Sequence, residues 1–113
     1  MIQIYHNPRC GKSRNALVLV EETKQEYAVI KYLELPPTYP DLVLLLKKLH
    51  LKPLELVRQK EKIWIENYKN KSMTDESIIN AMVSNPILIE RPILIKGDKA
   101  IIGRDLEKVN HFL

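Results

Sequence analysis

The sequence is poor in cysteine, glycine and bulky aromatic residues. Its 113 residues include one cysteine, three glycines, one tryptophan and one phenylalanine. A single cysteine excludes an internal disulfide, so any thiol redox cycle needs a second thiol from another molecule. No apolar run is longer than Leu42 to Leu46, which is far shorter than the roughly 20 residues of a membrane-spanning helix. The N-terminal residues turn polar at once, so we expect no signal peptide and a cytoplasmic location.

The overall composition is that of an ordinary globular protein. Apolar residues make up 45% of the chain and charged residues 28%. The length fits one domain over residues 1–113. The net charge of +4 could attract an anionic substrate or nucleic acid, but the lysines are spread along the chain. This spread argues against a dedicated nucleic-acid module.

Hydrophobic periodicity predicts strands and helices along the whole chain. Strands are expected at residues 2–5, 27–33, 93–96 and 99–102, with Gly97-Asp98 as a hairpin turn between the last two. Helices are expected at residues 11–23, after a cap at Thr38, from Pro53 to near Arg58, at 63–68, from a cap at Thr74 to before Asn85-Pro86, and at 105–113.

The order of these elements predicts an α/β fold. The first strand, helix and strand form a βαβ unit, in which the two strands run parallel. The order βαβ, then helices, then ββα is that of a thioredoxin-like fold with a mixed four-stranded sheet. We expect the helical insertion between the two halves to cover about residues 38–85.

The loop that joins the first strand to the first helix carries the only cysteine, Cys10. There it faces free backbone N–H groups and the positive end of the helix dipole. Positive charge nearby adds to this effect, and its sources are His6, Arg9, Lys12 and Arg14. We therefore expect a pKa below the usual value of about 8.5 for a cysteine thiol. The same loop, including Gly11 and Ser13, is expected to bind an oxyanion beside the sulfur.

Other interpretations of this loop are weaker. A lone cysteine is often a buried structural residue, but the polar and cationic neighbours favour a functional one. Gly11-Lys12-Ser13 imitates the end of a phosphate-binding P-loop, yet that motif requires glycine where His6 stands. Phosphatase loops place arginine six residues after the cysteine, where this chain has Ala16.

Segments along nearly the whole chain share the pattern of a known family. They are Ile4-Tyr5-His6-Asn7-Pro8-Arg9-Cys10, Ser13-Arg14-Asn15, Tyr32-Leu33-Glu34, Pro36-Pro37, Leu56-Val57-Arg58, Asn85-Pro86-Ile87-Leu88-Ile89-Glu90-Arg91-Pro92-Ile93 and Ile102-Gly103-Arg104. Together they resemble the signature of the glutaredoxin-dependent arsenate reductases.

The resemblance implies a role for several side chains. Cys10 matches the nucleophile, and His6 matches a histidine that helps to lower its pKa or only hydrogen-bonds the loop. Pro92 matches the proline that thioredoxin-like folds hold in the cis form. Three arginines match the oxyanion-binding set, although each could alone be a surface residue; they are Arg58, Arg91 and Arg104. Guanidinium groups suit this role because their paired N–H donors match the oxygens of a tetrahedral anion.

The resemblance also implies a reaction and its partners. The Cys10 thiolate attacks arsenate and forms a covalent adduct. Ser13 stands where a C-x-x-C site has its second cysteine, so the protein cannot resolve this adduct alone. Glutathione then acts as co-substrate, glutaredoxin removes it as a mixed disulfide, and arsenite leaves, as arsenic detoxification requires. No bound cofactor is expected, and too few Cys, His and carboxylate ligands cluster for a metal site.

Two departures leave alternatives open. The chain ends soon after Arg104, whereas the established reductases continue with a C-terminal tail, and Arg9 replaces a smaller residue. One alternative is therefore a glutathione-dependent thiol oxidoreductase. Another is an Spx-like transcription regulator that binds RNA polymerase, but members that sense oxidation use a C-x-x-C pair, which Ser13 removes.

Overall fold

The computed structural model describes every residue from Met1 to Leu113. The chain forms two compact units, one made of Met1–Leu35 with Arg91–Leu113 and the other of Pro36–Glu90. The second unit is continuous in sequence and holds the helices expected of the insertion. The description of the whole chain as a single domain stays a prediction.

The first unit is a mixed sheet with helices packed against it. Its strands are β1 (Ile2–Tyr5), β2 (Tyr27–Ile30), β3 (Ile93–Lys96) and β4 (Lys99–Ile102), and its helices are α1 (Gly11–Glu22) and α6 (Leu106–Phe112). The strand order is β2-β1-β3-β4. β1 runs parallel to β2 and antiparallel to β3, and β4 is antiparallel to β3. This confirms the predicted mixed four-stranded sheet of a thioredoxin-like fold.

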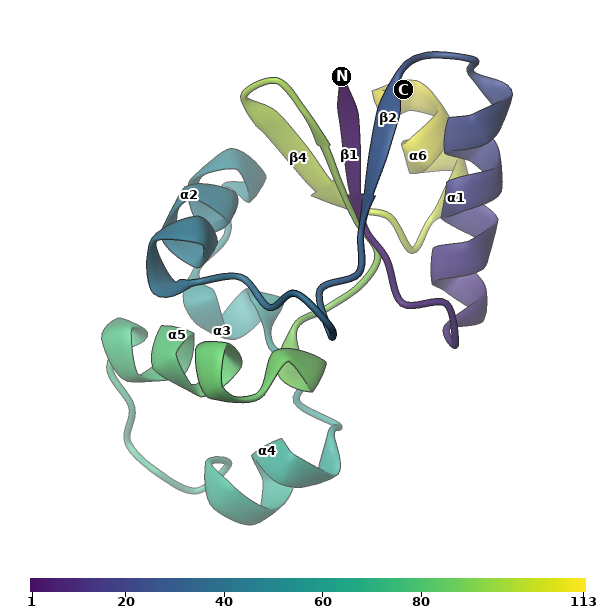
Figure 1. Cartoon of the computed structure of the whole chain (residues 1–113). Helices are drawn as coiled ribbons and strands as arrows, with labels where there is room; N and C mark the ends of the chain where they lie inside the picture. The colour runs from purple at the N-terminus through teal and green to yellow at the C-terminus, as the bar shows by residue number, and fades with distance from the viewer. The chain divides into compact units, whose positions relative to one another are not determined.

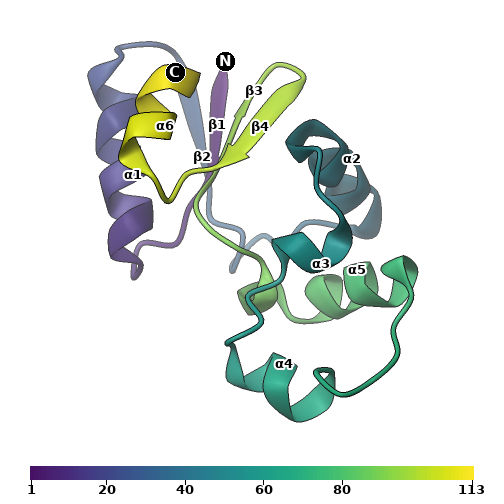
Figure 2. The ribbon, with the colours of Figure 1, turned by 180° about the vertical axis from the view of Figure 1, so that it is seen from behind.

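The core of this unit lies between the sheet and its two helices. Figures 1 and 2 show α1 and α6 side by side on one face of the sheet. Alternate residues of a strand point to the same face, so Ile2 and Ile4 of β1 both face these helices. The buried cluster there consists of Ile2, Ile4, Ala16, Val20, Leu94 and Val109. This packing holds α1 against the sheet.

The second unit is entirely helical. Its elements are α2 (Tyr39–Leu49), α3 (Pro53–Leu56), α4 (Lys62–Asn67), α5 (Asp75–Ser84) and the 3-10 turn η1 (Pro86–Leu88). Thr38 caps α2 in a capping box with Asp41, and Thr74 caps α5. Both caps were predicted, because each hydroxyl precedes an apolar helical repeat and can accept from a free N–H group.

Two predicted boundaries differ from the structure by more than one residue. β2 ends at Ile30 rather than at residue 33, because the N–H groups of Glu34 and Leu35 both bond to the carbonyl of Lys31 and turn the chain. α3 ends at Leu56, because Val57 is extended and bridges Ile89. The turn η1 was not predicted at all.

The register of the sheet brings three loops to one of its ends. Tyr5, the last residue of β1, pairs with Ile93, the first residue of β3. Ile93 in turn pairs with Ile102, the last residue of β4. The segments that carry Cys10, Arg91 and Arg104 therefore leave the sheet at the same end.

Candidate active site

Cys10 occupies the N-cap position of α1. Its backbone is extended, the conformation usual at a helix N-cap. Its N–H bonds to the carbonyl of Asn7 at 3.0 Å, while its carbonyl accepts from the N–H of Arg14 at 3.0 Å. The thiol is free and partly exposed. The sulfur thus lies where the first N–H groups of the helix have no partner within the helix.

The surroundings of Cys10 favour its thiolate. Burial raises the pKa of the Cys10 thiol, but the other contacts of the thiol, first the backbone N–H of Ser13 and the positive charge of Arg91, outweigh it in sum. The backbone N–H of Lys12 and a hydrogen bond from the Arg91 side chain add to the same direction. The net pKa is below the usual value of a cysteine thiol, as the sequence predicted.

The source of the positive charge differs from the prediction. The sequence placed it on neighbours of Cys10, whereas the charge that lowers the pKa is that of Arg91, which is far away in the chain. Arg9 and Arg14 are exposed, and Arg14 donates from Nη1 to the carbonyl of Pro8 at 3.0 Å. Arg91 reaches Cys10 because β3 pairs with β1.

The turn before β3 is joined to the loop after β4. The Arg91–Pro92 peptide bond is cis, the form expected from the sequence. Arg104 donates from Nη1 to the carbonyl of Arg91 at 3.0 Å, and the N–H of Gly103 donates to the carbonyl of Pro92 at 2.8 Å. Two of the three predicted oxyanion arginines, Arg91 and Arg104, are therefore neighbours.

His6 and Ser13 form a buried pair beneath the Cys10 loop. Their side chains are 6% and 0% exposed, and His6 Nδ1 lies 2.6 Å from Ser13 Oγ. Ser13 Oγ also accepts from the N–H of Asn7 at 3.0 Å. Burial lowers the pKa of His6, and the charges of Lys31 and Arg14 lower it further. A positively charged His6, as the sequence predicted, is thus disfavoured.

The hydroxyl and the backbone N–H of Ser13 have different partners. Its hydroxyl is used inside the loop, whereas its backbone N–H is directed at Cys10. The same hydroxyl oxygen therefore joins the imidazole of His6 to the backbone of Asn7. Gly11, the first residue of α1, is exposed beside Cys10.

Arg58 belongs to the second unit. Its Nη1 lies 3.0 Å from Glu61 Oε2, and its Nε lies 3.8 Å from Glu90 Oε1. The sequence analysis did not identify these two carboxylates. The spacing of three residues between Arg58 and Glu61 was an available signal, because such residues are neighbours in a helical turn. Glu90 offered none, because its pairing depends on the fold.

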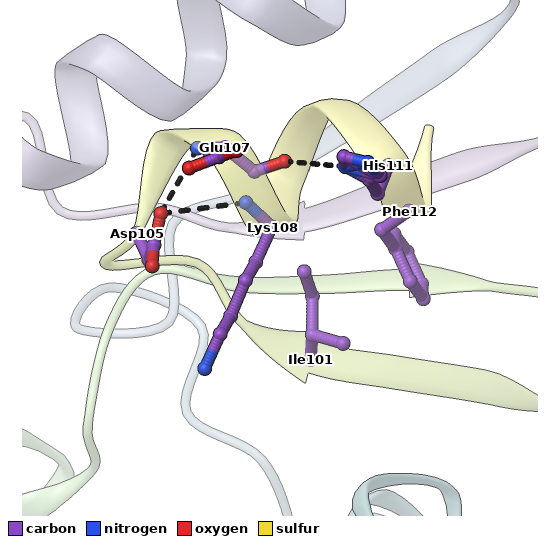
Figure 3. A pocket seen from close by; sticks show the side chains of 6 residues that line it. All are labelled: Ile101, Asp105, Glu107, Lys108, His111 and Phe112. Atoms are coloured by element: carbon purple, nitrogen blue, oxygen red, sulfur yellow. Dashed lines mark hydrogen bonds between the residues drawn. The ribbon is translucent and has the colours of Figure 1, made fainter.

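Outside these residues, the structure has no metal-binding cluster and no helix that could span a membrane, but it has a hollow at α6. No three His, Cys, Asp or Glu side chains come together as a metal ion would need. None of the helices is both long and apolar enough to cross a membrane. Figure 3 shows a hollow lined by α6 and by Ile101 of β4, where Asp105 accepts from the N–H groups of Glu107 and Lys108. This hollow contains no predicted site residue.

Known proteins resemble the chain over nearly its full length. The ArsC family profile matches residues 5–112. The Escherichia coli protein YfgD is 47% identical over 110 residues, which cover 96% of this chain and 92% of YfgD. An arsenate reductase of Neisseria meningitidis is 38% identical over 99% of this chain and 97% of its own. The solved structure of an arsenate reductase from Vibrio cholerae superposes with a TM-score of 0.93, at 38% identity, over 99% of this chain and 97% of that one.

Proposed function

Because this chain belongs to the ArsC family, we propose that it is an arsenate reductase with Cys10 as its nucleophile. The observation that carries the proposal is the environment of Cys10, in which N–H groups and Arg91 lower the pKa of the thiol. The same donors suit a tetrahedral oxyanion, since both a thiolate and an oxyanion are stabilised by N–H groups at a helix N-terminus.

In the first step the protein supplies the nucleophile and the anion-binding groups. The Cys10 thiolate attacks arsenic, a sulfur–arsenic bond forms, and hydroxide leaves and takes up a proton to become water. Arsenic remains As(V) in this adduct. Arg91 and Arg104, with the N–H groups of Gly11 and Ser13, stabilise the negative charge, and Arg58 is the third arginine of the set. His6 holds the loop through Ser13.

Reduction then needs two external thiols, because the chain has one cysteine. Glutathione displaces a second hydroxide from arsenic. A glutaredoxin thiolate attacks the glutathione sulfur, and the electron pair of the arsenic–sulfur bond moves onto arsenic, giving As(III). Water releases arsenite and restores Cys10. The two electrons come from the thiols, so the proposed reaction needs no bound cofactor. Its need for reduced thiols supports a cytoplasmic location.

The test is arsenate-dependent NADPH consumption with glutathione, glutaredoxin and glutathione reductase. We expect turnover by the wild-type protein and none by Cys10→Ser. Consumption that depends on glutathione mixed disulfides but not on arsenate would instead identify a thiol oxidoreductase. Retention of RNA polymerase in a pull-down, with no turnover, would identify a transcription regulator.

A further inference from the structure

Arg58 is held between two carboxylates in the second unit. Its guanidinium lies 3.0 Å from Glu61 Oε2 and 3.8 Å from Glu90 Oε1. The side chains of Arg58, Glu61 and Glu90 are only 25%, 21% and 28% exposed. Their mutual attraction is therefore screened less by water than that of a fully exposed pair.

Backbone hydrogen bonds place both carboxylates. The N–H of Arg58 donates to the carbonyl of Leu88 at 2.7 Å, and that of Glu90 donates to the carbonyl of Leu56 at 2.9 Å. These bonds flank an antiparallel bridge between Val57 and Ile89. The N–H of Glu61 also donates to the carbonyl of Arg58 at 3.0 Å. The arrangement therefore belongs to the fold rather than to freely moving side chains.

The carboxylates and an oxyanion need the same donors. Carboxylate and arsenate oxygens both bind guanidinium N–H groups through charge-assisted hydrogen bonds. An anion that binds Arg58 must displace Glu61 or Glu90 from it, or must share the guanidinium with them. The carboxylate charges also repel an approaching dianion.

We propose that Glu61 and Glu90 set the affinity of the anion site, because they compete with the oxyanion for Arg58 and thereby weaken its binding. This inference rests on the proposed function, in which Arg58 binds the oxyanion. Removal of either negative charge then strengthens anion binding and leaves the chemical step at Cys10 unchanged. The expected signature is a lower KM for arsenate at a constant kcat.

The experiment compares Glu61→Gln and Glu90→Gln with a matched control. Each should lower the KM for arsenate by about two- to five-fold, the range expected when a partly exposed ion pair is removed. The control is Glu66→Gln, since Glu66 pairs with Lys62 at 3.8 Å and both side chains are well exposed. It changes the net charge equally, and its KM should equal that of the wild type.

A double-mutant cycle tests whether the effect passes through Arg58. In an Arg58→Ala background, Glu90→Gln should lower the KM much less than in the wild type, because only the direct repulsion of the dianion remains and no guanidinium is left to compete for. An equal effect with and without Arg58 would overturn the inference. So would an unchanged or higher KM in both single variants, since the carboxylates would then only orient the arginine.

A second readout separates this inference from the proposed function. Arsenate, or sulfate as an unreactive tetrahedral anion, should slow the alkylation of Cys10 by iodoacetamide. The half-protecting concentration should fall by the same factor in Glu61→Gln and Glu90→Gln. Failure of the wild type to reduce arsenate refutes the proposed function alone. Failure of these variants to improve protection, or no protection in any variant, refutes the inference.

Discussion

At the scale of single residues, one arginine and a few N–H groups outweigh the burial of Cys10. Burial raises the pKa of the thiol, but the N–H groups of Ser13 and Lys12 and the side chain of Arg91 lower it by more in sum. The thiolate is therefore favoured by contacts both within the loop and across the sheet. Each unit by which the pKa falls corresponds to about 1.4 kcal/mol of preference for the charged form.

The alkylation rate of Cys10 should report this shift directly. Because only the thiolate reacts, the rate should rise with pH and reach half of its maximum below about 8.5, the usual pKa of a cysteine thiol. Arg91→Ala should move this midpoint to higher pH. Arg9→Ala removes the same charge from an exposed neighbour and should leave the midpoint in place. An unshifted midpoint in the wild-type protein would refute the thiolate environment described above.

His6 should lower the stability of the protein in acid. Its pKa is lowered in the folded state, mainly by burial, so the unfolded state binds its proton first as the pH falls. Neutral His6 therefore contributes to the free energy of unfolding. This contribution is complete above about pH 6.5, the usual histidine pKa, and is lost as the pH falls through the pKa of His6 in the folded state.

Urea unfolding at several pH values, for the wild type and for His6→Gln, measures this effect. The difference in unfolding free energy between the two proteins should shrink as the pH falls below about 6.5. A difference that stays constant with pH would show that His6 has an ordinary pKa in the folded protein.

At the scale of elements, the loop between β4 and α6 approaches the core closely at Gly103. A Cβ atom there would collide with Leu94 and would lie 3.1 Å from Cγ2 of Val109 and 3.4 Å from Cγ of Pro92. Leu94 and Val109 are fully buried in the core of the first unit. Glycine at this position therefore lets the chain pass from β4 to Arg104 beside the turn at Pro92.

Gly103→Ala should destabilise the protein by about 1–3 kcal/mol, as overpacking of a core does. Chemical denaturation measures the loss. Gly11→Ala is the matched control, because a Cβ there would meet only Nη2 of Arg14 at 3.6 Å, an ordinary contact. Equal stability of the two variants would contradict the close packing at Gly103.

The sequence predicted those features of the helices and strands that depend on residues close together in the chain. The hairpin at Gly97-Asp98 and the caps at Thr38 and Thr74 are local signals, and all three were predicted correctly. The end of β2 was predicted too late, because an apolar pattern does not show that Lys31 accepts two N–H groups in a turn.

At the scale of the whole molecule, interactions between distant parts of the chain were the hardest to predict. The family resemblance identified Arg91 as a site residue. It did not predict that Arg91 lowers the pKa of Cys10, because that effect depends on the pairing of β1 with β3. The pairing of Arg58 with Glu90 depends likewise on the bridge between Val57 and Ile89. Neither contact leaves a pattern in the sequence, because the partners are far apart and only the fold joins them.

Because Cys10 is the only cysteine, a spectroscopic probe can be attached to the native chain at a single position. A maleimide fluorophore or a nitroxide has one sulfur to react with, so no background cysteines need to be replaced first. A label on this atom reports from the anion site itself. Paired with one cysteine introduced into Pro36–Glu90, it would measure the distance between the two units in solution.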